Sequence, residues 1–114
     1  MHASPSAMNE QQLNSLRAAS AAAAGLLKAL SNEDRLLLLC QLVEGEKAVS
    51  ELEAATGIHQ PTLSQQLGVL RQERLVSTRR EGKFIYYQLA SGHAERVLAL
   101  LYELYCLPER PHAD

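Results

Sequence analysis

The feature that most constrains the fold is a pair of short helix signals separated by one glycine. Residues 49–56 and residues 60–73 each place apolar side chains three or four positions apart, as the buried face of a helix requires. Gly57 ends the first helix, because glycine adopts the left-handed conformation at which helices commonly stop, and Ile58 supplies an apolar anchor. Two helices joined by a tight, glycine-containing turn are the signature of a helix-turn-helix. The side chains expected to face the core are Val49, Leu52, Ala55, Leu63, Leu67 and Leu70.

A β-hairpin is predicted directly after this motif. Residues 75–78 and 84–89 are rich in β-branched and aromatic residues or alternate between polar and apolar ones. The intervening residues 79–83, Arg-Arg-Glu-Gly-Lys, are expected to form a basic tip. A helix-turn-helix followed by such a hairpin is a winged helix-turn-helix.

Three further helices complete the predicted order. One spans about residues 10–30, one runs from an N-cap at Ser31 or Asn32 to Glu44, and one spans about residues 93–107. The second of these is apolar nearly all round, which predicts the central helix of the core. The predicted fold is therefore mainly α with a small β-hairpin, in the order helix, helix, helix, helix, strand, strand, helix. A plain helical bundle is the alternative.

The first and last helices indicate a homodimer. The first carries an apolar heptad seam whose centre, Ser20 and Ala23, is small enough for another helix to approach closely. The last helix has apolar residues on more than one face. We expect both helices to pack against a second subunit, and packing of the first helix on its own domain alone is the alternative.

Length and composition set the remaining limits. The 114 residues allow one domain with a real core, expected over residues 10–107, with mobile tails over 1–9 and 108–114. Two cysteines are too few for a disulfide scaffold. No secretory signal and no membrane-length apolar run is evident, so a cytoplasmic protein without a membrane partner is expected.

The second helix of the motif presents a polar, almost uncharged face opposite its leucines. Small and amide side chains suit the major groove of DNA, because Gln can pair with adenine and Ser or Thr can reach base edges. A solvated face, the alternative, would normally carry Glu–Lys pairs, whereas Arg71 is the one charge between Gln60 and Gln72. Gln60 and Gln66 lie nearer the core flank and rank below Gln65. The residues of this helix predicted to contact DNA are Gln60, Pro61, Thr62, Ser64, Gln65, Gln66 and Arg71.

The distribution of charge supports the same surface. The net charge of −2 excludes a protein that coats nucleic acid indiscriminately. Residues 59–90 nevertheless carry a net charge of +3, and the rest of the chain carries −5. Arg79, Arg80 and Lys83 at the hairpin tip are expected to meet phosphates or a minor groove. A solvated tip that simply favours charged residues is the alternative.

Three segments give the chain a family resemblance. Residues 27–36 (LKALSNEDRL), 58–67 (IHQPTLSQQL) and 75–82 (LVSTRREG) resemble the ArsR-type bacterial repressors, over about residues 13–107. The resemblance implies a homodimer built on the first and last helices. It also implies binding to double-stranded operator DNA with inverted-repeat half-sites, and release when an inducer binds. His59 replaces the family's usual serine at the recognition-helix N-cap, so we expect a slightly frayed start there.

The metal sites of the family have no counterpart in this chain. The positions of its Cys-x-Cys pair are Ala48 and Ser50, and its site on the last helix corresponds to Ser91, His93, Leu104 and Leu107. Only His93 remains, and one imidazole cannot form a four-ligand zinc site. No metal and no cofactor is therefore expected. The other histidines are scattered: His2, His59 and His112.

The two cysteines supply a different sensor. Cys40 in the second helix and Cys106 at the end of the last helix, with their flanking residues, look like the persulfide-sensing SqrR and BigR branch of the family. In that branch a thiolate takes a sulfane sulfur and its partner closes a disulfide or polysulfide bridge. The chemistry requires two thiols within reach and one thiolate. A bridge would restrain the dimer in a geometry that no longer fits both half-sites. The alternative for Cys40 is an inert core residue.

Other functions remain open at this point. The same repressor could answer to another thiol oxidant or, with a third ligand from the partner subunit, to a thiophilic metal. A thiol peroxidase would need a base beside Cys106, and His112 and Arg110 lie on a loose tail. A dimerisation module without DNA contacts would not need the basic hairpin. We therefore expect a transcriptional repressor and not an enzyme.

Overall fold

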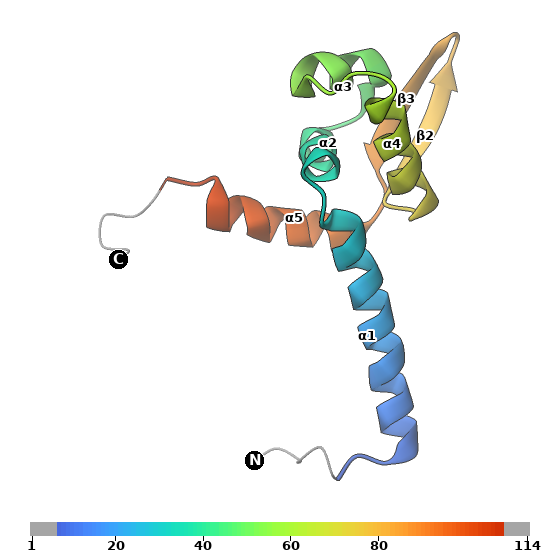
Figure 1. Cartoon of the computed structure of the whole chain (residues 1–114), viewed down its shortest axis with the longest axis vertical. Coiled ribbons are helices and arrows are strands. Elements are labelled where there is room, and N and C mark those ends of the chain that lie inside the picture. The colour runs from blue at the N-terminus through green and yellow to red at the C-terminus, as the bar shows by residue number, and fades with distance from the viewer. Residues whose placement is uncertain (1–6, 109–114) are drawn as a thin grey trace.

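A computed structural model gives the structure of the protein and describes residues 7–108. Within these residues the chain forms helices and one small antiparallel sheet, and the winged helix-turn-helix order is confirmed (Figure 1). The first helix has the predicted bounds, and the last is shorter than predicted. The elements are α1 (Glu10–Leu30), α2 (Glu33–Val43), β1 (Lys47–Ala48), α3 (Val49–Thr56), α4 (Thr62–Gln72), β2 (Val76–Glu81), β3 (Phe84–Leu89) and α5 (Gly92–Tyr105).

The sheet has a third strand that the sequence analysis did not predict. The strand order is β1-β3-β2, and β1 pairs with β3 through Ala48 opposite Tyr86. A strand of two residues has no periodicity to read, so only its partner defines it. β1 therefore joins the segment after α2 to the hairpin.

The hairpin is longer and its turn tighter than predicted. Pairing of β2 with β3 continues to Glu81 opposite Phe84, so Arg79 and Arg80 lie in a strand and not in a tip. The turn itself is Gly82 and Lys83, and Gly82 has a φ of +63°, which glycine adopts without steric cost. The prediction of a five-residue basic tip was therefore wrong.

The core is built mainly from leucines of the helices around α2. These side chains are less than 2% exposed, and burying each contributes roughly 1.5–3 kcal/mol. Gly57, with a φ of +74°, ends α3 as predicted, and Ile58 is buried behind it. The largest fully buried side chains are Leu38, Leu39, Leu52, Leu63, Leu67 and Leu70.

α2 is the central helix of the core, as predicted, and one predicted core residue of α3 was wrong. α2 packs against α1, α3, α4, α5 and β3, although Leu37 and Val43 are about half exposed, at 49% and 47%. Ala55 of α3 is exposed as well, while Val49 is only partly buried. Both helices therefore pack through one face, and α2 keeps a solvent face that includes Cys40.

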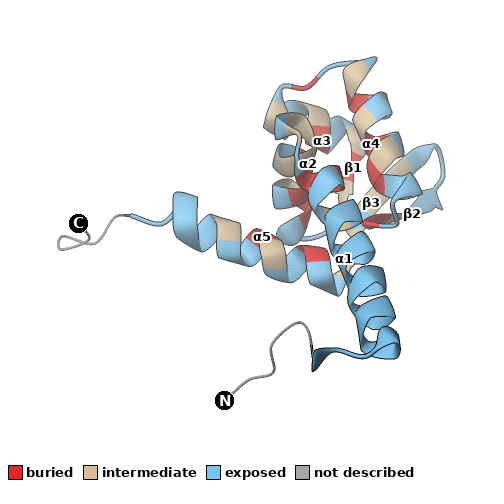
Figure 2. Ribbon diagram, turned by 60° about the horizontal axis from the view of Figure 1, so that its bottom comes forward, coloured by how far each residue is buried: buried red, intermediate tan, exposed pale blue. Residues whose placement is uncertain are grey.

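α1 and α5 project from this core (Figure 1). Figure 2 shows α1 exposed along most of its length, and only its last turn, Ala29 and Leu30, is buried. α5 buries Ala94 and Leu98 and exposes much of its remaining apolar surface. The start of α1 is nonetheless well defined, because Asn9 and Gln12 form a reciprocal capping box. No helix among the described residues is long and apolar enough to cross a membrane.

Candidate nucleic-acid interface and thiol pair

α4 separates a buried leucine face from an exposed polar face. Leu63, Leu67 and Leu70 are fully buried. Of the residues predicted to contact DNA, Ser64, Gln65 and Arg71 are exposed, together with Gly68, and Thr62 is half-buried. α4 packs against β2, so the helix and the wing form neighbouring parts of one surface.

The start of α4 differs from the prediction. The helix begins at Thr62 with Pro61 as N-cap, so Gln60 and Pro61 precede it and His59 is not the capping residue. In place of the fraying expected at His59, the structure shows two side-chain contacts in this segment. The Gln60 Oε1 atom accepts a hydrogen bond from the Ser64 amide at 3.0 Å, and His59 Nδ1 lies 2.9 Å from Glu53 Oε2. Gln60 therefore satisfies an unpaired amide of the first turn.

Gln66 lies on the flank of α4 that faces α2. It is half-buried, and its Oε1 atom accepts a hydrogen bond from Arg35 Nη1 at 2.9 Å. The same guanidinium donates through Nε to the Ala29 carbonyl at 2.6 Å and through Nη2 to the Lys28 carbonyl at 3.3 Å. Arg35 thus joins the end of α1 to α4, and one acceptor of Gln66 is already used.

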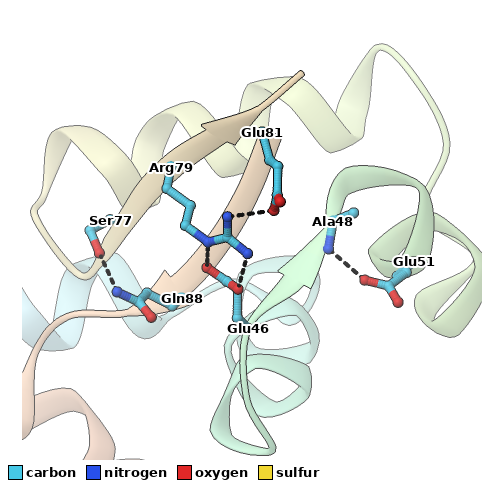
Figure 3. Close-up of polar contacts among 7 residues, drawn as sticks. All are labelled: Glu46, Ala48, Glu51, Ser77, Arg79, Glu81 and Gln88. Atoms are coloured by element: carbon cyan, nitrogen blue, oxygen red, sulfur yellow. Dashed lines mark hydrogen bonds and ion pairs between the residues drawn. The ribbon is translucent and has the colours of Figure 1, made fainter. Parts of the chain in front are cut away.

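The three basic residues of the wing have different surroundings. Lys83 lies in the turn and Arg80 is exposed on β2. Arg79 is tied within the protein: Nε and Nη2 donate to the two Glu46 oxygens at 2.6 and 2.9 Å, and Nη1 donates to Glu81 at 2.7 Å (Figure 3). Its guanidinium also lies 4.6 Å from the centroid of the Tyr86 ring. These contacts make Arg79 less available to a phosphate than Arg80 or Lys83.

Electrostatics agree with this geometry. The hydrogen bonds from Arg79 lower the pKa of the Glu46 carboxyl, and those bonds raise the pKa of Arg79 above its already high value. The carboxylate and the guanidinium are therefore both charged across the physiological pH range.

Both predicted sensor thiols are exposed. Cys40 lies on the solvent face of α2, and Cys106 is the C-cap residue of α5, a helix that packs against α2. Exposure contradicts the reading of Cys40 as an inert core residue. Partial desolvation of the thiol and then the negative charge of the Cys106 thiolate raise the pKa of Cys40. The second effect acts from Cys106 on Cys40, across the contact between α5 and α2.

Several residues that matter here were not found from the sequence. Glu46, Arg35 and Glu53 were not singled out, since their partners lie 33, 31 and 6 residues away and no periodic pattern links them. Among the described residues no group of three or more His, Cys, Asp or Glu is placed to hold a metal ion. His2, His112 and Arg110 lie outside the described residues.

Comparison with known proteins gives consistent matches. Residues 32–78 match the model for bacterial regulatory proteins of the arsR family. The chain is 55% identical over 84 residues to a biofilm growth-associated repressor of Agrobacterium fabrum, covering 74% of this chain and 72% of the relative. It is 53% identical over 87 residues to a protein of the same name from Xylella fastidiosa, covering 76% of each chain.

Solved structures extend the likeness to most of the chain. The transcriptional repressor BigR from Xylella fastidiosa superposes with a TM-score of 0.75 at 48% identity, covering 89% of this chain and all of that one. Reduced HlyU from Vibrio cholerae superposes with a TM-score of 0.78 at 41% identity, covering 82% and 98%. At these sequence identities, the likeness supports membership of the same family as well as a shared fold.

Proposed function

Since this chain belongs to the ArsR family of bacterial regulatory proteins and is a DNA-binding transcriptional repressor of the BigR type, we propose that Cys40 and Cys106 are its switch. Modification or bridging of the two thiols by a reactive sulfur species, a persulfide or polysulfide, releases the operator. The observation that carries the proposal is the placement of two exposed thiols on α2 and at the end of α5, two helices in contact, where the Cys106 charge contributes to the raised pKa of Cys40. The relatives are transcription regulators, and the chain is not an enzyme.

Operator binding in this proposal uses α4 and the wing together. Ser64 and Gln65, exposed on α4, read base edges in the major groove, and Gly68 allows close approach of the helix. Arg71, Arg80 and Lys83 neutralise phosphates and so fix the register on the duplex. Three other predicted contacts rank lower because their side chains are already bonded within the protein: Gln60, Gln66 and Arg79. Pro61 and Thr62, at the start of α4, remain predicted contacts.

A homodimer completes the proposal. α1 and α5 leave large apolar side chains exposed, an arrangement that marks an interaction surface. A twofold dimer would present two copies of α4 to the inverted-repeat half-sites of the operator. The large exposed apolar residues of the two helices are Leu13, Leu16, Leu27, Leu100, Tyr102, Leu104 and Tyr105.

The proposed chemistry takes two steps. The Cys106 thiolate attacks the sulfane sulfur of a persulfide RSSH, forming a Cys106 persulfide and displacing the thiol RSH. Cys40 then loses its proton and attacks Cys106 Sγ, which closes a disulfide and releases hydrogen sulfide. The two protein thiols are oxidised and the persulfide is reduced, and a second sulfane sulfur would leave a polysulfide bridge instead. Cys106 attacks first because the raised pKa keeps Cys40 protonated.

The experiment combines mass with DNA binding. An operator fragment is selected from random duplexes with the reduced protein, which is then treated with a persulfide donor. We expect intact mass to show added sulfur or a loss of two hydrogens, and a gel shift to show release. Cys106→Ser should bind the operator and stay bound after treatment. A wild-type protein with unchanged mass and unchanged binding would refute the switch.

A hydrogen peroxide arm and a metal arm separate the alternatives. Release by peroxide but not by persulfide would assign the switch to another oxidant. Release by a thiophilic metal, with both thiols protected from alkylation, would assign it to a metal.

A further inference from the structure

The contact between Glu46 and Arg79 crosses the whole sheet of the wing. Arg79 lies opposite Tyr86 of the central strand, and Tyr86 lies opposite Ala48 of β1. Glu46 directly precedes β1, so the Arg79 guanidinium reaches from one outer strand to the start of the other (Figure 3). On the way it lies over the Tyr86 ring of the central strand. The wing is therefore joined to the segment after α2 by a side-chain contact as well as by strand pairing.

This contact has the geometry that makes a surface ion pair effective. An isolated exposed pair contributes little, but a bidentate arginine–carboxylate pair in a network is the exception. Here both Glu46 oxygens accept from Arg79, Glu81 accepts a third bond, and the Glu46 side chain is only 28% exposed. The planar guanidinium fixes the direction of β2 relative to Glu46.

Arg80 and Lys83 depend on that direction. Arg80 follows Arg79 in β2, and Lys83 lies in the turn that β2 leads into. We propose that Glu46 is a positioning residue, which holds the wing through Arg79 so that Arg80 and Lys83 meet the operator phosphates. This role rests on the operator contacts proposed above.

The same contact connects the wing to the helix that carries Cys40. α2 ends at Val43, and Glu46 follows after two further residues. A bridge at Cys40 that displaces α2 would displace Glu46, and Arg79 would carry that displacement into the wing. Glu46 thus lies between the thiol pair and one of the two DNA-contacting elements.

Glu46→Gln tests the role, with Glu44→Gln as its matched control. Both variants remove one negative charge, but Glu44 is 69% exposed and pairs only loosely with Lys47, at 3.6 Å. Operator affinity of the reduced proteins is measured against salt concentration. Each phosphate contact contributes about 0.9 to the slope of log K against log salt. Relative to Glu44→Gln, we expect Glu46→Gln to bind roughly tenfold more weakly, with a slope shallower by about one to two.

Three outcomes would overturn the role. If the two variants bind the operator with equal affinity and equal slope, the Glu46–Arg79 contact has no effect on operator binding. A steeper slope with tighter binding in Glu46→Gln would mean that Glu46 masks Arg79, which then binds phosphate itself. Weaker binding with an unchanged slope would mean a smaller folded fraction and no loss of phosphate contacts.

A second variant guards against misfolding. Arg79→Lys keeps the positive charge but cannot form the bidentate pair, so it should reproduce the shallower slope. If the wild type does not respond to persulfide, the thiol switch is refuted. The comparison of Glu46→Gln with Glu44→Gln still tests the positioning role, because it is made on the reduced proteins.

Discussion

The two thiols differ in what surrounds them. Cys40 sits on a helix packed into the core and feels both desolvation and the Cys106 charge, whereas Cys106 lies beyond the last residue of α5. A thiol with a raised pKa is a poor nucleophile near neutral pH, because the thiolate is the attacking species. In the proposed switch the two cysteines would therefore have different tasks: Cys106 would react with the persulfide donor and Cys40 would close the bridge.

This difference predicts a pH effect in a single-cysteine variant. Removing the Cys106 charge by Cys106→Ser should lower the pKa of Cys40, since one of its two causes disappears, while desolvation keeps it above the ordinary value. The midpoint pH for alkylation of Cys40 by iodoacetamide, followed by mass spectrometry, should therefore be lower in Cys106→Ser than in the wild type. An identical midpoint would show that the sulfurs lie too far apart to interact.

Among the elements, α2 is the one that is linked both to the proposed thiol switch and to the proposed DNA-contacting helix α4. It carries Cys40 on its exposed face, its leucines fill the core, and Arg35 in its first turn bonds to the end of α1 and to Gln66 of α4. A helix with contacts at each end moves as a unit, because packed interiors transmit strain.

Arg35 should contribute measurably to stability. Arg35→Met keeps the apolar stem but leaves the Ala29 and Lys28 carbonyls and Gln66 without this donor. A hydrogen bond to a charged group contributes about 1.5–3 kcal/mol, but these three bonds are only partly buried or exposed, so water replaces much of what is lost. We therefore expect a net loss of about 2 kcal/mol in the free energy of unfolding. Urea denaturation at a fixed protein concentration measures it. Arg71→Met, at an exposed position of α4, is the control and should change stability by less than about 0.5 kcal/mol. A loss in Arg35→Met no larger than in the control would contradict the structural role of Arg35.

The elements also show where sequence reasoning succeeds. The leucine spacing of α4 and the signal at Gly57 are local, so the helix-turn-helix was predictable, and strand composition revealed the hairpin. β1 and the Glu46–Arg79 contact depend on segments far apart in the sequence, and no local pattern encodes them. The start of α4 was misplaced because Gln60 caps the helix through its side chain from outside it.

At the scale of the whole molecule, a single chain is more extended than its length requires. Its radius of gyration is 18.0 Å, against about 13 Å for a compact domain of this size. The excess comes from α1 and α5, the helices that expose the most apolar surface (Figure 2). A second subunit packed on these helices would bury that surface and set the spacing of the two recognition helices.

The dimer can be tested on its proposed surface. Leu16→Glu combined with Leu100→Glu places charges on α1 and α5, at positions that are 50% and 52% exposed. We expect the wild type to sediment as a dimer and this variant as a monomer with weaker operator binding. Phe84→Glu, at a wing position that is 49% exposed, is the control and should remain a dimer. A wild-type protein that sediments as a monomer while binding the operator tightly would contradict the dimer.

The charge distribution indicates that the proposed release works by moving elements and not by changing the charge of the protein. Net positive charge is confined to residues 59–90, and modifying two thiols would change the net charge of −2 very little. In the proposed switch, release would therefore come from a change in the relative position of elements, and such couplings typically span roughly 5- to 150-fold in affinity.

The most direct measurement is operator affinity on one sample in three states. Fluorescence anisotropy gives the Kd of the reduced protein, of the same protein after persulfide treatment with the bridge confirmed by mass, and of that protein after reduction with dithiothreitol. The thiol switch predicts that Kd rises by about tenfold or more on bridging and returns on reduction. A bridged protein that binds the operator as tightly as the reduced one would contradict it.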